Sequence, residues 1–98
     1  MPTTIRATGI PWYAREDYPR ILAVMEDAQK LHTRWEDWFK AAKQLRDRLR
    51  AQGYLVVEAH IDPDTFPDWC RANGHNVDAK GRSAFANRAA YEKFRITN

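Results

Sequence analysis

The sequence predicts an α+β fold that is mostly helical, with three or four helices packed on a small sheet of two or three strands. Two periodicities support this fold class. Residues 33–50 repeat apolar side chains at the three- and four-residue spacing of an amphipathic helix. Residues 54–61 alternate with the period of two that a half-buried strand requires. A chain of 98 residues has the common size of one domain, so a single domain over 1–98 is expected.

The N-terminal segment 1–13 is predicted to be an extended arm or a short strand. Threonines and an isoleucine favour a strand over 3–8, whereas Gly9 and Pro11 are residues typical of turns. Trp12 lies outside any periodic stripe, so we expect it to be the most exposed tryptophan.

The helices have recognisable start and stop signals. A first helix is expected to begin between Arg15 and Pro19, because proline is tolerated in a first turn. Thr33 and Glu36 have the spacing of a capping box and predict the start of the longest helix, which Gly53 ends. The apolar stripe of this helix is expected to be buried, and it consists of Trp35, Trp38, Ala42, Leu45 and Leu49.

The second half of the chain begins with the clearest strand, over 54–61. The acidic, proline-containing turn 62–64 ends this strand, and a short helix follows it. Asp78 is a suitable N-cap for a last helix that runs to about Phe94.

The strand over 54–61 needs a partner, because a lone strand leaves its backbone groups unpaired. Either the segment 3–8 or a second subunit supplies that partner. The strand contains neither proline nor lysine to protect an edge, so a homodimer with twofold symmetry is predicted. The alternative is a monomer in which the N-terminal arm or the last helix covers that edge. Trp12, Tyr54 and Val56 are the candidate interface residues, since aromatic side chains are enriched in interface cores.

Composition limits the chemistry. Sixteen basic and 13 acidic residues are interleaved and give a net charge of +3, which is typical of an ordinary solvated surface. Cys70 is the single cysteine, so the chain forms no internal disulfide and no cysteine-based zinc site. The sequence lacks a signal-peptide pattern at its start and an apolar stretch of membrane-spanning length, which predicts a cytoplasmic protein without membrane contact. No cofactor is expected.

One group of residues could hold a metal ion or act as acid and base. His60, Asp62, Asp64 and Asp68 surround the end of the predicted strand, and oxygen ligands of this kind bind hard cations. The same residues are those that turns and helix caps use, and this reading is favoured over a metal site. Cys70 lies in a short helix whose dipole could activate a thiol, but a buried structural cysteine is the favoured reading.

Basic residues of the long and the last helices suggest a second possibility, the binding of nucleic acid. The candidate phosphate contacts are Arg46, Arg48, Arg50, Arg82 and Arg88. Residues two apart on a helix point in different directions, so the arginine run around residue 48 surrounds the helix rather than forming a stripe. A solvated helix surface is therefore favoured over a phosphate-binding one.

Several residues together resemble a group of small bacterial proteins known from genome sequences, for which no activity is established. The resemblance rests on Phe66, the pair Trp69 and Cys70, Gly74, Asp78 and Phe85 in the second half, and on the segments 15–18 and 35–38 in the first. It implies a bacterial, cytoplasmic, single-domain protein and assigns no site residue.

The sequence therefore favours a non-catalytic accessory or protein-interaction module that associates with itself. The alternatives are a weak nucleic-acid-binding protein that uses the arginines, and a small enzyme or metal protein that uses the turn after residue 60. No phosphate-binding glycine loop and no Ser-His-Asp signature occurs in the chain, so an enzyme is not the first prediction.

Overall fold

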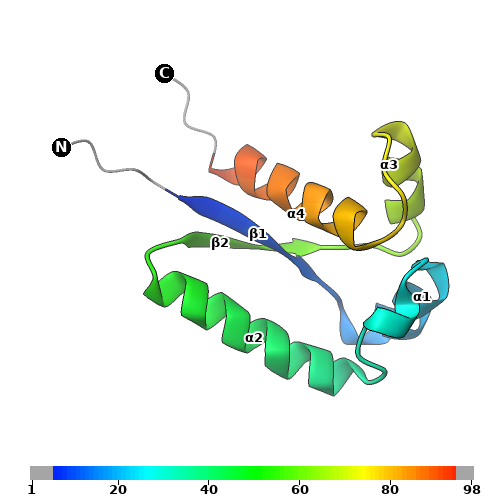
Figure 1. Cartoon of the computed structure of the whole chain (residues 1–98), viewed down its shortest axis with the longest axis horizontal. Helices are drawn as coiled ribbons and strands as arrows, with labels where there is room; N and C mark the ends of the chain where they lie inside the picture. Colours follow the sequence, from blue (N-terminus) through cyan, green and yellow to red (C-terminus); the bar gives the residue numbers. More distant parts are fainter. Residues whose placement is uncertain (1–5, 95–98) are drawn as a thin grey trace.

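The computed structural model describes residues 6–94, and within them it contains two strands and four α-helices around one small sheet (Figure 1). This confirms the α+β class and gives the lower of the two expected strand numbers. The elements in chain order are β1 (Ala7–Trp12), the 3₁₀ turn η1 (Arg15–Asp17), α1 (Tyr18–Val24), the 3₁₀ turn η2 (Ala28–Lys30), α2 (Trp35–Ala51), β2 (Leu55–His60), α3 (Phe66–Ala72) and α4 (Ala79–Lys93).

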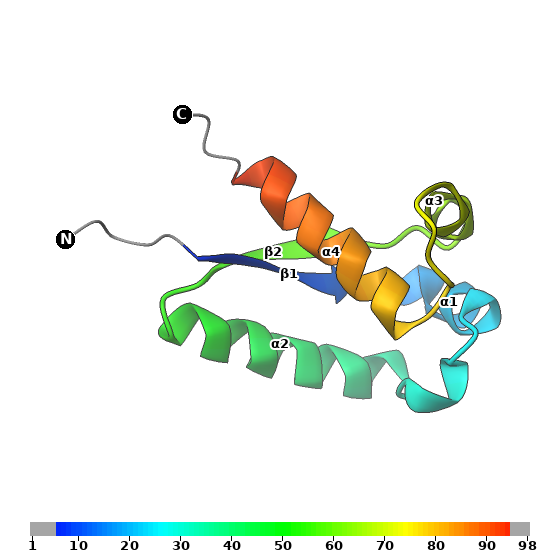
Figure 2. The same cartoon turned by 45° about the horizontal axis from the view of Figure 1, so that its top comes forward.

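The two strands run parallel, with Ala7 opposite Leu55 and Trp12 opposite His60. Parallel neighbours cannot be joined by a hairpin, so the chain between them returns through α1 and α2. Figures 1 and 2 show α2 on one face of the sheet and α4 on the other, both running opposite to the strands. The arrangement has three layers, and the sheet lies between two helices.

Alternation along the strands sends different side chains to the two helices. On the α2 face, the ring of Trp12 lies 5.3 Å from that of Trp38, and the carboxylate of Glu58 contacts Arg46. On the α4 face, Gly9 lies against the backbone of Ala86, and the neighbouring strand presents small apolar side chains there. The predicted apolar alternation of β2 thus faces α4, whereas its mixed face lies toward α2.

The main core is aromatic and lies between β1, α1 and α2. Trp12, Tyr13, Tyr18 and Trp38 are all buried, and neighbouring rings in this group are 4.7 to 6.3 Å apart. The expectation that Trp12 is exposed is wrong, because its side chain is only 6% exposed. As the last residue of β1, it follows the alternation of the strand and turns toward α2, although no periodic stripe of its own indicated this.

The N-terminal strand lies further along the chain than predicted. It begins at Ala7, whereas residues 3–5 of the expected strand lie outside the described range. Gly9 and Pro11 are both inside β1, although both are typical of turns. Each has a local reason to be there: glycine permits the close approach of α4, and the proline nitrogen faces away from β2, as shown below.

Two details of α2 differ from prediction. Arg34, not Thr33, occupies the N-cap position, and no side chain caps the helix. Glu36 instead forms an ion pair with Arg15 at 2.8 Å. Leu45 is 37% exposed although it lies on the apolar stripe. The sheet has only two strands within residues 6–94, so this side of α2 projects past its edge.

The last helix begins as predicted. The side chain of Asp78 accepts a hydrogen bond from the backbone N–H of Gly81 at 3.1 Å, and the helix ends at Lys93. Gly81 is itself required, because a Cβ atom at this position would lie 2.2 Å from the backbone oxygen of Asn76. Within the described part of the chain, no helix has the length and apolar character that crossing a membrane requires.

We expect Gly9→Ala to destabilise the protein by about 1–3 kcal/mol, the usual range for overpacking a tight contact. The added Cβ would lie 1.9 Å from the backbone oxygen of Ala86, so β1 and α4 must separate. Urea denaturation measures the change, and Ala7→Ser at an exposed position of the same strand is the control, with an expected change within about 0.5 kcal/mol. Equal midpoints for Gly9→Ala and the wild type would show that the contact is not tight.

Candidate functional site

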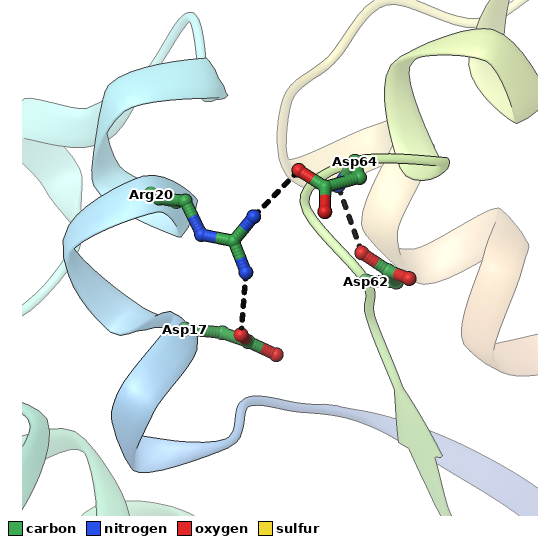
Figure 3. Close-up of polar contacts among 4 residues, drawn as sticks. All are labelled: Asp17, Arg20, Asp62 and Asp64. Atoms are coloured by element: carbon green, nitrogen blue, oxygen red, sulfur yellow. Dashed lines mark hydrogen bonds and ion pairs between the residues drawn. The ribbon is translucent and has the colours of Figure 1, made fainter.

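The acidic turn after β2 works as a structural clamp (Figure 3). Asp62 accepts a hydrogen bond from the backbone N–H of Asp64 at 2.8 Å, which is the geometry of a side-chain-stabilised turn. Arg20 of α1 donates to Asp64 at 2.6 Å and to Asp17 at 2.8 Å. The clamp therefore ties the crossover helix to the turn that leads into α3.

The predicted metal ligands do not converge. Asp68 pairs with Arg71 at 2.9 Å on the surface of α3, away from the contacts of Asp62 and Asp64. Within residues 6–94, no group of three or more histidine, cysteine, aspartate or glutamate side chains could hold a metal ion. The structure thus places His60, Asp62, Asp64 and Asp68 in the same region without assembling a coordination sphere.

Cys70 is fully buried, and its sulfur packs beside the start of α4, where a Cβ at Gly81 would lie 3.2 Å from it. Burial raises the pKa of the Cys70 thiol above its usual value, with smaller contributions from nearby carboxylates. A raised pKa keeps the thiol protonated and weakens it as a nucleophile. His75 stacks on the ring of Trp69, with 5.7 Å between the ring centroids.

A buried ion pair joins Asp27 to Arg82 of α4 through two hydrogen bonds of 2.6 and 3.0 Å. Arg82 is one of the candidate phosphate contacts, and the structure places its guanidinium in the interior, where it is already paired with Asp27. The hydrogen bond from Arg82 lowers the pKa of Asp27 below its usual value. Nearby Tyr13 is also buried, and mainly this burial raises its pKa to about 12.

Sequence reasoning missed this pair, since 55 residues separate its members. One signal was present in the sequence. Arg82 lies four and eight residues before Ala86 and Ala90, so it belongs to the apolar face of α4. An arginine on such a face requires a buried acidic partner.

The other four candidate phosphate contacts differ in whether their charge is already paired. Arg46 donates to Glu58 at 2.7 Å and to Asp47 at 3.1 Å, and Arg88 pairs with Glu92. Arg48 and Arg50 are exposed, and neither forms an ion pair within residues 6–94. The structure brings the arginines of α2 and of α4 to opposite faces of the sheet, so the five candidates do not form one surface.

The outer edge of β2 is the surface that sequence reasoning pointed to most directly. Two hydrogen bonds show which residues of β2 and its end face β1. The N–H of Leu55 donates to the carbonyl of Arg6, and the N–H of Ile61 donates to the carbonyl of Trp12, both at 2.9 Å. Alternation then turns the backbone N–H and C=O groups of Val56, Glu58 and His60 outward. Within residues 6–94, no strand pairs with this edge.

The predicted contact residues at this edge differ in exposure. Tyr54 and Val56 are half-buried, and the side chain of Val56 packs against the core. Leu55 is 40% exposed and was not a candidate. Trp12, the third candidate, is buried under α2 and presents no surface to a partner. The groups exposed at this edge are therefore mainly backbone N–H and C=O groups, with the side chains that flank them.

The outer edge of β1 is different. Here Ala7, Gly9 and Pro11 turn their backbone groups outward, and the proline has no N–H to donate. A groove of about 230 Å³ lies beside this edge. It is lined by Ile10, Pro11, Tyr13, Leu31, Trp38, Ala41, Ala42, Leu45 and Arg82. The groove involves α2 and α4 but no residue of β2, which places it on the β1 side of the sheet.

Comparison of the chain with models of known protein families, with curated proteins and with solved structures found no match in any of the three.

We expect Asp27→Asn to cost about 3–5 kcal/mol in the free energy of unfolding, because it leaves the Arg82 charge buried and unpaired. The matched control is the double variant Asp27→Leu with Arg82→Met, which removes both charges and is expected to be close to neutral. Urea denaturation at neutral pH measures both. A loss below about 1 kcal/mol for Asp27→Asn would show that Arg82 reaches solvent when its partner is removed.

The pair also makes stability depend on acid. The pKa of Asp27 is lower in the folded chain than in the unfolded chain, so its contribution is present above the unfolded value of 3.8 and is lost as the pH falls through the folded value. The double variant should lack this part of the acid-induced loss. Identical acid denaturation of the wild type and the double variant would contradict this assignment.

Tyr13 predicts a loss of stability in alkali. Its pKa rises from 10.0 in the unfolded chain to about 12 in the fold, so its contribution is complete below pH 10.0 and is lost as the pH rises toward 12. Tyr13→Phe should be less sensitive to this pH range than the wild type. Denaturation midpoints across the range, with Tyr91→Phe at an exposed position as the control, measure the difference.

Proposed function

We propose that the protein is a non-catalytic interaction module that accepts a strand from another chain on the outer edge of β2. The observation that supports this proposal is the row of outward backbone groups on Val56, Glu58 and His60, which has no strand neighbour within residues 6–94. An extended chain placed there would pair with these groups and enlarge the sheet, which is a common mode of peptide recognition.

The two edges of the sheet differ in the way that such a function needs. Natural proteins protect strand edges with proline, lysine or a covering element. β1 has Pro11 at an outward position, so an added strand there would lose a hydrogen bond. β2 contains neither proline nor lysine, and the exposed Leu55 adds apolar surface beside its open edge. The preferred position for a further strand is therefore next to β2.

A second copy of the chain is one possible source of the strand. Two β2 strands related by a twofold axis would pair antiparallel and form a four-stranded sheet. The homodimer that the sequence favours remains a prediction, and Trp12 is no longer among its contact residues because it is buried. A bacterial origin and a cytoplasmic location also remain predictions.

The proposal predicts that His60→Pro weakens strand addition about threefold to tenfold, the effect of one lost hydrogen bond. His60 is suitable because its side chain is exposed and its N–H faces outward, so the substitution spares the pairing of β2 with β1. His60→Ala keeps the N–H and is the matched control, with unchanged binding expected.

Two measurements test the proposal. Sedimentation equilibrium up to high micromolar concentration tests the second copy, and amide hydrogen exchange with short extended peptides tests other chains. Strand addition should slow the exchange of the amides of Val56, Glu58 and His60. A monomer whose three amides are not protected by any extended peptide at millimolar concentration would refute strand addition.

A further inference from the structure

Charge is distributed unevenly along the protein. Figure 1 shows the end of the molecule at which β2 begins and at which α2 and α4 finish. The charged residues near this end give a surplus of four positive charges. We call it the basic end, and its charged groups are Arg6, Lys43, Arg46, Asp47, Arg48, Arg50, Glu58, Arg88, Glu92 and Lys93. The remaining described residues carry ten carboxylates against eight cations. The outer edge of β2 therefore begins in the positive region of the molecule.

Three of these cations form a row on the flank of α2 that lies toward β2. Arg46 marks this flank because its guanidinium contacts Glu58 at 2.7 Å. Lys43 and Arg50 lie three residues before and four residues after it, so they project from the same side of the helix. The groove beside β1 is lined by Ala41 and Leu45, which places the row on the opposite flank of α2.

Lys43 and Arg50 carry the excess charge of this row. Arg46 is already compensated by Glu58 and Asp47, whereas Lys43 and Arg50 form no ion pair within residues 6–94. Lys43 instead lies over the ring of Phe39, 4.4 Å from its centroid. Their charges thus remain available to a chain that lies along β2.

We infer that the strand accepted by β2 is an acidic extended segment of another protein. This inference rests on the proposed function and names the chemistry of its partner. Carboxylates on alternate residues of the added strand would lie on the α2 face of the sheet and meet Lys43 and Arg50, while its backbone pairs with β2. Glu58 lies on the same face, but its charge is already offset by Arg46 at 2.7 Å. Charge complementarity of this kind selects the partner and speeds its association.

A second copy fits this edge less well. A twofold axis between two β2 strands would place both α2 helices on the same face of the enlarged sheet, with their basic rows turned toward each other. Lys43 and Arg50 of one copy would then approach the same residues of the other copy, and like charges at close range oppose association. An acidic strand brings the opposite charge to the same position.

Three short peptides of equal length test the inference, in which valine alternates with glutamate, with serine or with lysine. We expect the glutamate peptide to bind the full chain at least about tenfold more tightly than the lysine peptide at low salt, and to slow amide exchange at Val56, Glu58 and His60. The preference should decrease as salt is added, because exposed charges are screened.

A matched pair of variants locates the charge effect. Arg50→Glu should weaken binding of the glutamate peptide about threefold to tenfold, whereas Arg48→Glu should change it less than about twofold. Both residues are exposed and lie in the last turns of α2, so the two substitutions disturb the helix end to a similar degree. Of these two arginines, Arg50 lies on the flank that faces β2 and Arg48 does not.

Each other outcome is decisive. Equal binding of the three peptides would overturn the inference about charge and leave strand addition standing. A stable dimer that protects the outer amides at low salt would also overturn it, in favour of the second copy. Binding of a single-stranded oligonucleotide without protection of these amides would show that the basic end serves nucleic acid instead. No protection by any chain would overturn both the inference and the proposed function.

Discussion

The parallel pairing of β1 with β2 is the constraint on which the rest of the structure depends. Because parallel strands need a long connection, α1 and α2 must leave the sheet and return, and this places α2 on one face. The other face must then be covered by the remaining chain, which α4 does. In the described residues α2 and α4 cover the two faces of the sheet, and no further strand covers either edge.

Contacts outside the sheet hold the two halves of the chain together. The ion pair between Asp27 and Arg82 links the segment between α1 and η2, inside the crossover, to α4. Next to it, the backbone N–H of Glu26 donates to the carbonyl of Val77, and its carboxylate accepts the N–H of the same residue. Desolvation of a buried charge pair opposes its attraction, so such a pair contributes more to the choice of one packing than to net stability. Here it fixes where α4 begins relative to the crossover.

The sequence predicted those features that depend on one helix or one strand alone. The course of α2, the strand after residue 54 and the cap at Asp78 followed from periodicity and local hydrogen bonding. The start of β1 did not, because Gly9 and Pro11 are explained by their neighbours in space, α4 and the empty side of the strand. Leu45 was misjudged for the same reason, since the width of the sheet decides whether a stripe is covered.

The candidate edge was predictable in outline and not in detail. Its strand, its lack of protecting residues and its need for a partner are all visible in the sequence. The basic row beside it is not, because Lys43 and Arg50 acquire their meaning only when Arg46 is known to contact β2. The pairing of Arg82 with Asp27 likewise needed the structure, because two residues so distant in sequence give no local pattern.

Pro11 has a consequence for how far the sheet can grow. A sheet whose two edges both accept strands can stack copies head to tail without end, and such open contacts produce filaments. In this protein the outward Pro11 leaves the β1 edge one donor short, which makes it a weaker template for a further strand than β2. Under the proposed addition of a strand at β2, the weaker β1 edge would oppose open-ended growth of the sheet, and the position of one proline is the reason.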